Sequence, residues 1–274
     1  MKLAICEWVT PIKGPAIFPR LKSLGIDGIQ LDDWDAAAQN HPMSQPYVQD
    51  LYQNAAEQAG ISLIGMAGNA LGRDGGMIYP IDSAQGRRCW EDLTCGLDAC
   101  AQMKLPVYLA PAFFAGFPRT QADRQRIAQC LKNACHYASG NQVTIALESI
   151  FPASDLLRLY EQINSPNFGI YYDTQNPVTY AGINVPSDLR AIGSGKIVQI
   201  HIKDGINSIQ GSVPLGKGET DFFGAAKAIH EIGYDSWIVL ENYYSRPCFS
   251  SEFTDPWDRI ARDVETARNA FHIT

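Results

Sequence analysis

The stretch Ile197-Val198-Gln199-Ile200-His201-Ile202-Lys203 is the clearest indication of the fold. It begins with a nearly continuous apolar run, which is typical of a parallel β-strand that is buried on both faces. Seven other short apolar runs of this kind occur along the chain. The eight predicted strands are residues 3–9, 28–31, 62–67, 107–112, 143–148, 168–173, 197–203 and 236–241.

Longer segments with a helical spacing of apolar residues separate these runs. One helix is predicted after Asp82-Ser83, another after Thr120 and a third from near Asp221. The 274 residues divide into eight units of about 34 residues, close to the size of one βα repeat. No Gly-x-Gly-x-x-Gly follows the first strand, which disfavours an open, doubly wound sheet. We therefore predict an α/β fold, a single (β/α)₈ TIM barrel that forms one domain over residues 1–274.

Charge and composition restrict the classes of partner. The chain has 22 Lys and Arg against 29 Asp and Glu, and the formal net charge of −7 argues against a sequence-independent grip on nucleic acid. The chain lacks a run of about 18 apolar residues, so no transmembrane helix is expected. The seven cysteines are odd in number and include no Cys-x-x-Cys, so we expect reduced thiols in a cytoplasmic protein.

Four consecutive predicted strands end in side chains that are costly to bury: Glu148, Asp173, His201 and Glu241. The carboxyl ends of barrel strands form the active-site face, and neighbouring strands lie about 4.8 Å apart, so these side chains can converge. Three carboxylates at one point repel each other unless some are protonated or a cation neutralises them. With one imidazole they form a donor set that suits Mn²⁺, Mg²⁺ or Co²⁺, with Zn²⁺ as a further option. Alternatively, each acid caps the following helix or pairs with a basic side chain.

These strand ends resemble those of the xylose-isomerase-like superfamily of TIM barrels, which contains sugar and sugar-phosphate isomerases and epimerases. The resemblance covers essentially the whole chain. The matching segments are Leu147-Glu148, Tyr172-Asp173-Thr174-Gln175-Asn176, His201-Ile202-Lys203-Asp204, Leu215-Gly216-Lys217-Gly218-Glu219-Thr220-Asp221-Phe222 and Leu240-Glu241-Asn242. The resemblance implies that Glu148, Asp173, His201 and Glu241 are metal ligands and that the two glutamates are also the acid/base residues. Ketose 3-epimerases of this group usually have His and Arg where this chain has Asn176 and Lys203.

Further residues after the strands are candidates for substrate binding. Tryptophans at a barrel mouth can stack on a sugar, polar side chains can bind hydroxyl groups, and Lys217 and Arg246 lie where many TIM barrels bind phosphate. The candidates are Glu7, Trp8, Trp34, Asn69, Asn176, Lys203, Lys217 and Arg246. Phe113-Phe114 follow the fourth strand, and His41 lies in the loop after the second strand, within reach of the mouth.

The resemblance implies a divalent-metal-dependent isomerase or epimerase that removes a proton next to a ketose carbonyl through a metal-stabilised cis-enediolate. The expected partner is a small-molecule sugar or sugar phosphate, with a homo-oligomer as an option, and not nucleic acid or a membrane. Three alternatives remain: a dehydratase of the inosose or dehydroshikimate type, a non-catalytic sugar- or metal-binding barrel, and an endonuclease IV-type enzyme. The last is disfavoured because its trinuclear site is rich in histidine, whereas only one of the five histidines here lies in a predicted strand.

Overall fold

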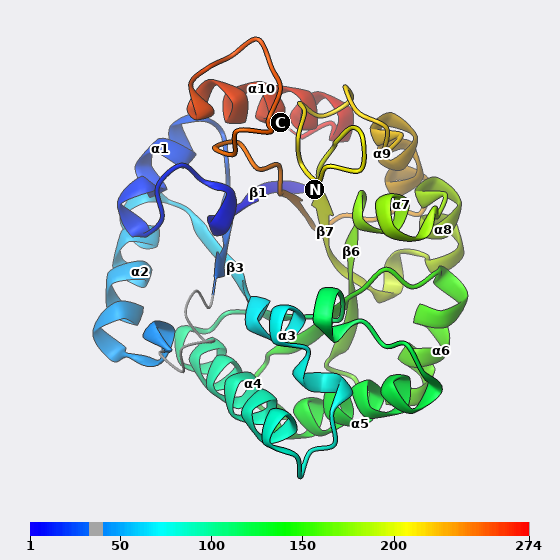
Figure 1. Cartoon of the computed structure of the whole chain (residues 1–274). Coiled ribbons are helices and arrows are strands. Elements are labelled where there is room, and N and C mark those ends of the chain that lie inside the picture. The colour runs from blue at the N-terminus through cyan, green and yellow to red at the C-terminus, as the bar shows by residue number, and fades with distance from the viewer. Residues whose placement is uncertain (33–40, 274) are drawn as a thin grey trace.

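The computed structural model describes residues 1–32 and 41–273. Eight parallel strands pair in chain order, and β1 pairs with β8 to close the barrel (Figure 1). The strands are β1 (Lys2–Cys6), β2 (Gly28–Asp32), β3 (Ser62–Ala67), β4 (Val107–Pro111), β5 (Thr144–Glu148), β6 (Phe168–Asp173), β7 (Ile197–Ile202) and β8 (Trp237–Leu240). The predicted (β/α)₈ TIM barrel is confirmed.

The helices form a ring around the strands (Figure 1). They are α1 (Phe18–Ser23), α2 (Pro46–Ala59), α3 (Asn69–Asp74), α4 (Ala84–Met103), α5 (Gln121–Tyr137), α6 (Ala153–Ile163), α7 (Asn176–Ala181), α8 (Val185–Ile192), α9 (Phe222–Glu231) and α10 (Pro256–Phe271). The three helices predicted from the sequence are α4, α5 and α9. Their first turns are capped by the side chains of Ser83, Thr120 and Asp221, each of which accepts a backbone hydrogen bond. No helix in the described part of the chain is long and apolar enough to cross a membrane.

The first predicted strand is too long by three residues. Residues Glu7–Val9 form a 3₁₀ turn, in which the backbone N–H of Thr10 donates to the carbonyl of Glu7. The chain therefore leaves the barrel at Cys6, and Glu7 does not continue the alternation of the strand. Strand β8 ends at Leu240, so Glu241 is the first residue after the strand.

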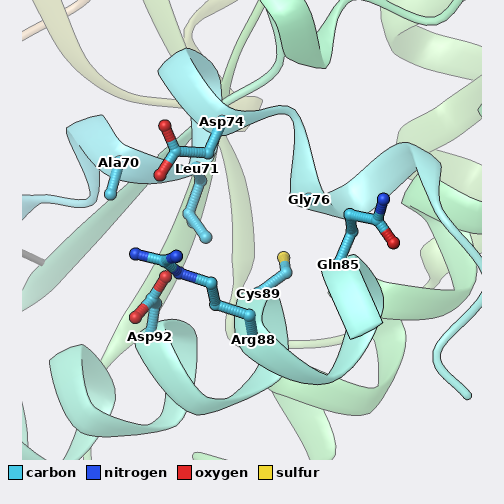
Figure 2. A pocket seen from close by; sticks show the side chains of 8 residues that line it. All are labelled: Ala70, Leu71, Asp74, Gly76, Gln85, Arg88, Cys89 and Asp92. Atoms are coloured by element: carbon cyan, nitrogen blue, oxygen red, sulfur yellow. The ribbon is translucent and has the colours of Figure 1, made fainter. Parts of the chain in front are cut away.

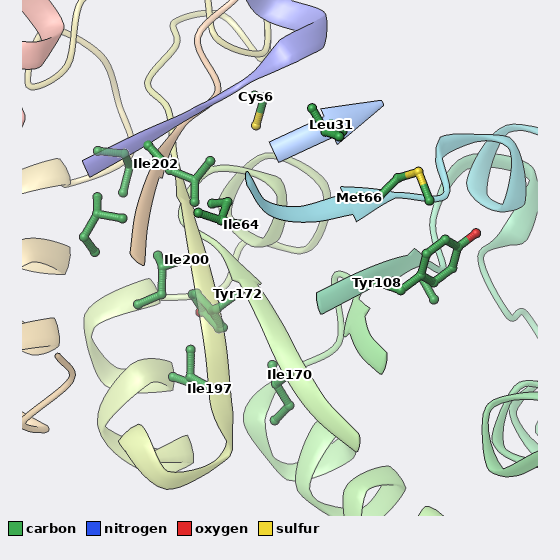
Figure 3. Packing of buried hydrophobic residues seen from close by; sticks show 14 of the residues in the cluster. Cys6, Leu31, Ile64, Met66, Tyr108, Ile170, Tyr172, Ile197, Ile200 and Ile202 are labelled. Carbon is green, nitrogen blue, oxygen red and sulfur yellow. The ribbon is translucent and has the colours of Figure 1, made fainter. Parts of the chain in front are cut away.

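Side-chain alternation along β6 and β7 sorts residues between the barrel interior and the outer core. Tyr172, Ile200 and Ile202 pack in the apolar cluster between the strands and helices, where Figure 3 shows them. Tyr171 belongs to a separate cluster, and its ring centroid lies 4.3 Å from that of His201. Because side chains alternate along a strand, Asp173 lies on the same side of β6 as Tyr171, facing the barrel interior.

Candidate metal centre

Glu148, Asp173, His201 and Glu241 meet at the carboxyl end of the barrel. Glu148 and Asp173 are the last residues of β5 and β6, His201 is the penultimate residue of β7, and Glu241 directly follows β8. One donor atom from each residue lies within 4.8 Å of the others, and all four residues are buried. The structure thus brings together the complete predicted ligand set.

The hydrogen bonds of His201 leave one ring nitrogen available to an ion. Its Nε2 lies 2.7 Å from Oε1 of Gln30, and since an amide oxygen only accepts, Nε2 carries the proton. Among the residues that the structure describes, its Nδ1 has no hydrogen-bond partner, and it lies 3.4 Å from Glu241 Oε2 and 3.6 Å from Glu148 Oε1. A buried imidazole with one N–H fixed by an oxygen and the other nitrogen unpartnered fits a metal ligand.

The carboxylates are held in place by other donors. Oδ1 of Asp173 accepts from the backbone N–H groups of Gln175 at 2.7 Å and Asn176 at 2.5 Å. The side-chain amide of Asn176 donates to Oε1 of Glu148 at 3.0 Å. These contacts fix one oxygen of Asp173 and one of Glu148, which is how ligand oxygens are oriented before an ion binds.

Lys203 is the one basic side chain inside this group of described residues. Its Nζ lies 2.5 Å from Glu241 Oε2 and 3.0 Å from Asp173 Oδ2, and the residue is buried. Burial opposes the charge on the Lys203 amine, but Asp173 and Glu241 outweigh it and raise its pKa well above the usual value. The single ammonium compensates only part of the charge of three carboxylates, so the site keeps a negative charge that a cation can neutralise.

The pKa values of the two carboxyls beside Lys203 move in opposite directions. Burial raises the pKa of Asp173 even though Lys203 opposes the shift. Burial acts in the same sense on Glu241, but Lys203 and His201 outweigh it and lower the pKa of Glu241. Such divergence is typical of functional sites, where environments separate the roles of similar groups.

The donor chemistry fits a hard divalent ion. Three carboxylate oxygens and one imidazole nitrogen suit Mg²⁺, Mn²⁺ or Co²⁺, and the orphaned Nδ1 of His201 is the observation that favours an ion over a plain ion-pair network. The group contains one histidine, in contrast to the histidine-rich set that the endonuclease alternative requires.

Above the four residues lies a cavity of about 430 Å³ at the mouth of the barrel. Five of the predicted substrate-binding residues line it. They are Trp8, Asn69, Asn176, Lys203 and Arg246. Phe113 and Phe114 also line it, and Trp8 donates from Nε1 to Glu241 Oε1 at 3.1 Å. These five residues and the two phenylalanines therefore surround one space.

Glu7 and Lys217 are not brought to this cavity. The carboxylate of Glu7 is buried and accepts hydrogen bonds from the backbone of Gly14 and Asp32 and from the Tyr52 hydroxyl. Glu7 therefore stabilises the loop after β1 and does not reach the cavity, because the chain turns after Cys6 instead of continuing as a strand. Lys217 is exposed and does not line the cavity.

The position of Lys217 follows from Asp204, whose buried carboxylate organises the loop after β7. Its Oδ2 accepts from the backbone N–H groups of Gly216 and Gly218, each at 2.9 Å, which leaves the intervening lysine in solvent. Trp34 lies outside the described residues.

A second cavity, of about 290 Å³, lies between α3 and α4 (Figure 2). Asp74, Arg88 and Asp92 contribute its charged side chains. His41, which the sequence placed within reach of the mouth, instead lies with Nε2 3.3 Å from Oδ1 of Asp92. None of the four candidate ligands lines this cavity.

Several residues at the site were missed by the sequence analysis. Gln30 and Cys6 both contact Nε2 of His201, the cysteine sulfur at 3.3 Å. Gln30 carried a detectable signal, since it is a polar residue inside an otherwise apolar predicted strand. Lys13 and Arg73 line the cavity from loops and helices that gave no such signal.

The fold and the buried carboxylate–imidazole set define a TIM barrel with a candidate single-ion centre at its strand ends. Residues 18–269 match the family described as Xylose isomerase-like TIM barrel, and the chain belongs to this family.

Its relatives include sugar-phosphate epimerases. The chain is 26% identical to the 2-epi-5-epi-valiolone 7-phosphate 2-epimerase of an Actinoplanes species, over 98% of this chain and 94% of that enzyme. It is 31% identical to L-ribulose-5-phosphate 3-epimerase of Escherichia coli, over 54% of this chain and 51% of that enzyme. The fold matches that of D-psicose 3-epimerase from Clostridium cellulolyticum, crystallised with D-tagatose, with a TM-score of 0.79 and 15% identity over 99% of both chains.

Proposed function

We propose that this protein is a divalent-metal-dependent epimerase of a ketose or ketose phosphate. The observation that carries the proposal is the placement of Glu148 and Glu241 on either side of a shared ion site with Asp173 and His201. The proposal is supported by the sugar-phosphate epimerases among the relatives. When bound, a divalent ion supplies a Lewis acid that stabilises the charge developing next to the substrate carbonyl.

In this proposal, the two glutamates transfer protons on opposite faces of the substrate. Glu148 accepts a hydrogen bond from Asn176 through Oε1. Its Oε2 accepts no hydrogen bond from a described residue. Glu241 is fixed by Trp8 through Oε1 and by Lys203 through Oε2. One glutamate removes the proton from the carbon next to the carbonyl, which becomes planar. The other glutamate returns a proton to the opposite face, and the configuration inverts.

Lys203 and the aromatic residues complete the environment. The Lys203 ammonium holds the Glu241 carboxylate in its ionised form, and it lines the cavity, where it can donate to a substrate oxygen. Trp8 and Phe113 cover the mouth with apolar surface, which lowers the local dielectric and strengthens these interactions.

Solvent-deuterium exchange tests the proposal. The Mn²⁺-loaded protein is incubated in D₂O with L-ribulose 5-phosphate, L-ribulose and D-psicose, and label at the carbon next to the carbonyl is followed by NMR. Glu148→Gln and Glu241→Gln should each lower the exchange rate by about 10²–10⁴-fold. Glu57→Gln, on the exposed face of α2, is the matched control and should leave the rate unchanged.

Full exchange in both glutamine variants would remove the two-base mechanism. Product analysis in the same samples separates epimerisation from dehydration, because loss of a hydroxyl gives an unsaturated carbonyl product that epimerisation does not.

A further inference from the structure

One side-chain amide at the mouth of the barrel has no role in the mechanism above. Gln210, in the loop after β7, lines the cavity over the candidate metal centre. Neither its Nε2 nor its Oε1 has a hydrogen-bond partner among the described residues, and both atoms are shielded from solvent. Because a buried amide without partners is unfavourable, its presence beside a cavity indicates a partner that the described chain does not supply.

Two other described side-chain amides line the same cavity, and both are engaged. Asn69 donates from Nδ2 to Asp32 Oδ1 at 2.9 Å. Asn176 donates from Nδ2 to Glu148 Oε1 at 3.0 Å. A carboxylate of the chain therefore orients each of these amides. No described residue orients the amide of Gln210, so a bound molecule can do so.

The backbone that carries Gln210 is held by Gln175, which is buried and follows β6 by two residues. Gln175 donates from Nε2 to the carbonyl of Ile209 at 3.2 Å, and its Oε1 accepts from the N–H of Gly211 at 2.8 Å. The backbone N–H of Gln175 donates to Oδ1 of Asp173 at 2.7 Å. One residue thus connects a candidate metal ligand to the residues before and after Gln210.

The loop after β8 holds the same segment through Gly211. The backbone N–H of Tyr243 donates to the carbonyl of Gly211 at 2.9 Å, and Tyr243 also lines the cavity. Gly211 has a φ of +51°, and a Cβ atom at this position would lie 2.9 Å from the backbone nitrogen of Tyr243, so this approach requires glycine. The backbone on the C-terminal side of Gln210 is therefore fixed, whereas its amide makes no bond.

The unpaired amide of Gln210 matches one kind of ligand group. The residue is half-buried, and turning its side chain toward a ligand breaks no hydrogen bond to a described residue. An amide has two N–H donors and an acceptor oxygen. A phosphate dianion or a carboxylate only accepts, so it leaves Oε1 unpaired. Two neighbouring hydroxyl groups satisfy both ends of the amide, because one accepts from Nε2 and the other donates to Oε1.

We propose that Gln210 is a specificity-determining residue that binds two neighbouring hydroxyl groups of the substrate. This inference rests on the proposed function and names the feature of the ketose that the site selects. A ketose carries such hydroxyl pairs on the carbons beyond the reacting one. Gln210 then holds the unreactive part of the chain, while Glu148 and Glu241 act next to the carbonyl.

Calorimetry with unreactive alcohols tests this contact without turnover. Ribitol has neighbouring hydroxyl groups, whereas pentane-1,5-diol has the same chain length and two isolated ones. Both are titrated in EDTA, so that chelation of an ion does not contribute. Wild type should bind ribitol at least about 10-fold more tightly than pentane-1,5-diol. Gln210→Leu should weaken ribitol binding by about 10–100-fold, as expected for loss of two neutral hydrogen bonds, and leave pentane-1,5-diol binding unchanged.

Thermal unfolding separates a substrate contact from a structural role. Gln210→Leu replaces an unpartnered amide by an apolar side chain of similar size, so its Tm should not fall. Gln129→Leu, on the exposed face of α5 and outside the cavity, is the matched control and should bind ribitol like wild type.

The deuterium-exchange assay gives a kinetic readout of the same contact. With Mn²⁺ and L-ribulose, Gln210→Leu should raise KM by about 10-fold or more and change kcat little. This split is expected for a contact that is made equally in the ground state and the transition state.

Several outcomes would overturn the assignment of Gln210. These are no ribitol binding by wild type in EDTA, unchanged ribitol binding in Gln210→Leu, or an equal loss in Gln129→Leu. A Tm that falls together with ribitol binding in Gln210→Leu would give the amide a structural role instead. Ribitol binding that depends on Gln210, with no exchange on any ketose, would leave the contact standing and remove the proposed function. Exchange with an unchanged KM in Gln210→Leu would do the reverse.

Discussion

Asp173 and Asp32 each end a strand on opposite sides of the barrel mouth, and each contacts a lysine. The Asp173–Lys203 contact at 3.0 Å is fully buried and lies among two further carboxylates. In the Asp32–Lys13 contact at 3.1 Å, the lysine is half-exposed. Both carboxylate oxygens of Asp32 accept hydrogen bonds, one from Lys13 and one from Asn69, and these two side chains line the cavity. The Asp173–Lys203 pair on the β5–β8 side thus lies among carboxylate oxygens that outnumber the donors around them. The Asp32–Lys13 pair on the β1–β3 side instead keeps N–H groups that Asp32 does not use. The first arrangement attracts a cation, whereas in the second the carboxylate and the ammonium balance each other.

The largest expected effect is on the free energy of unfolding, which Lys203→Met should lower much more than Lys13→Met. Lys203→Met leaves three buried carboxylates without their ammonium, so in EDTA it should lower the free energy of unfolding by about 3–5 kcal/mol. Mn²⁺ should recover much of this loss, because the ion replaces the missing charge. Urea unfolding with and without Mn²⁺ measures both effects. A loss that Mn²⁺ does not reduce would contradict the ion site.

The next effect concerns the amide that fixes His201. Gln30→Ala removes the acceptor of the Nε2 proton and should weaken Mn²⁺ binding by about 10–100-fold. Asn69→Ala, an amide on the opposite side of the mouth, is the matched control and should leave Mn²⁺ affinity unchanged. Calorimetric titration of the metal-free proteins with Mn²⁺ gives both constants. Equal affinities in the two variants would contradict the assignment of Gln30 as a positioning residue.

A pH dependence of the free energy of unfolding is expected from the buried carboxyl of Asp263. Asp263 of α10 accepts from the backbone of Leu215 and the side chain of Asn242, and its burial raises its pKa to about 7. The folded state then binds more protons than the unfolded state between the ordinary carboxyl pKa and about 7. The contribution of Asp263 to stability therefore falls as the pH rises through this range.

Urea unfolding at pH 5 and pH 8 tests this contribution. Asp263→Asn should cost about 1 kcal/mol, because one of the buried donors loses its acceptor, and it should remove this part of the decline with pH. The same decline in wild type and variant would show that Asp263 keeps an ordinary pKa.

The smallest expected effect is that of Lys13→Met on stability. Because the lysine side chain is 44% exposed, its loss should change the free energy of unfolding by less than about 1 kcal/mol. A stability loss as large as that of Lys203→Met would show that the two aspartate–lysine pairs are equivalent, and it would break the comparison.

Prediction from sequence succeeded where a residue's role follows from its place in one strand. The eight runs predicted the barrel, and Glu148, Asp173 and Glu241 stood out because acids at strand ends are conspicuous after apolar stretches. The predicted end of the first strand is wrong, since the same β-like composition continues through the 3₁₀ turn at Glu7. That turn moved Glu7 from the expected substrate contacts to a buried structural role.

The sequence by itself determined the fold and which residues gather around the candidate metal centre, because strand order and side-chain alternation are local periodic properties that project onto one barrel face. Only the tertiary structure decided the contact between Gln30 and His201, 171 residues apart, and the sharing of Asp32 by Lys13 and Asn69. It also decided that Lys217 lies in solvent. These outcomes depend on where loops of irregular backbone place long side chains, and that placement is set by hydrogen bonds between segments far apart in the chain.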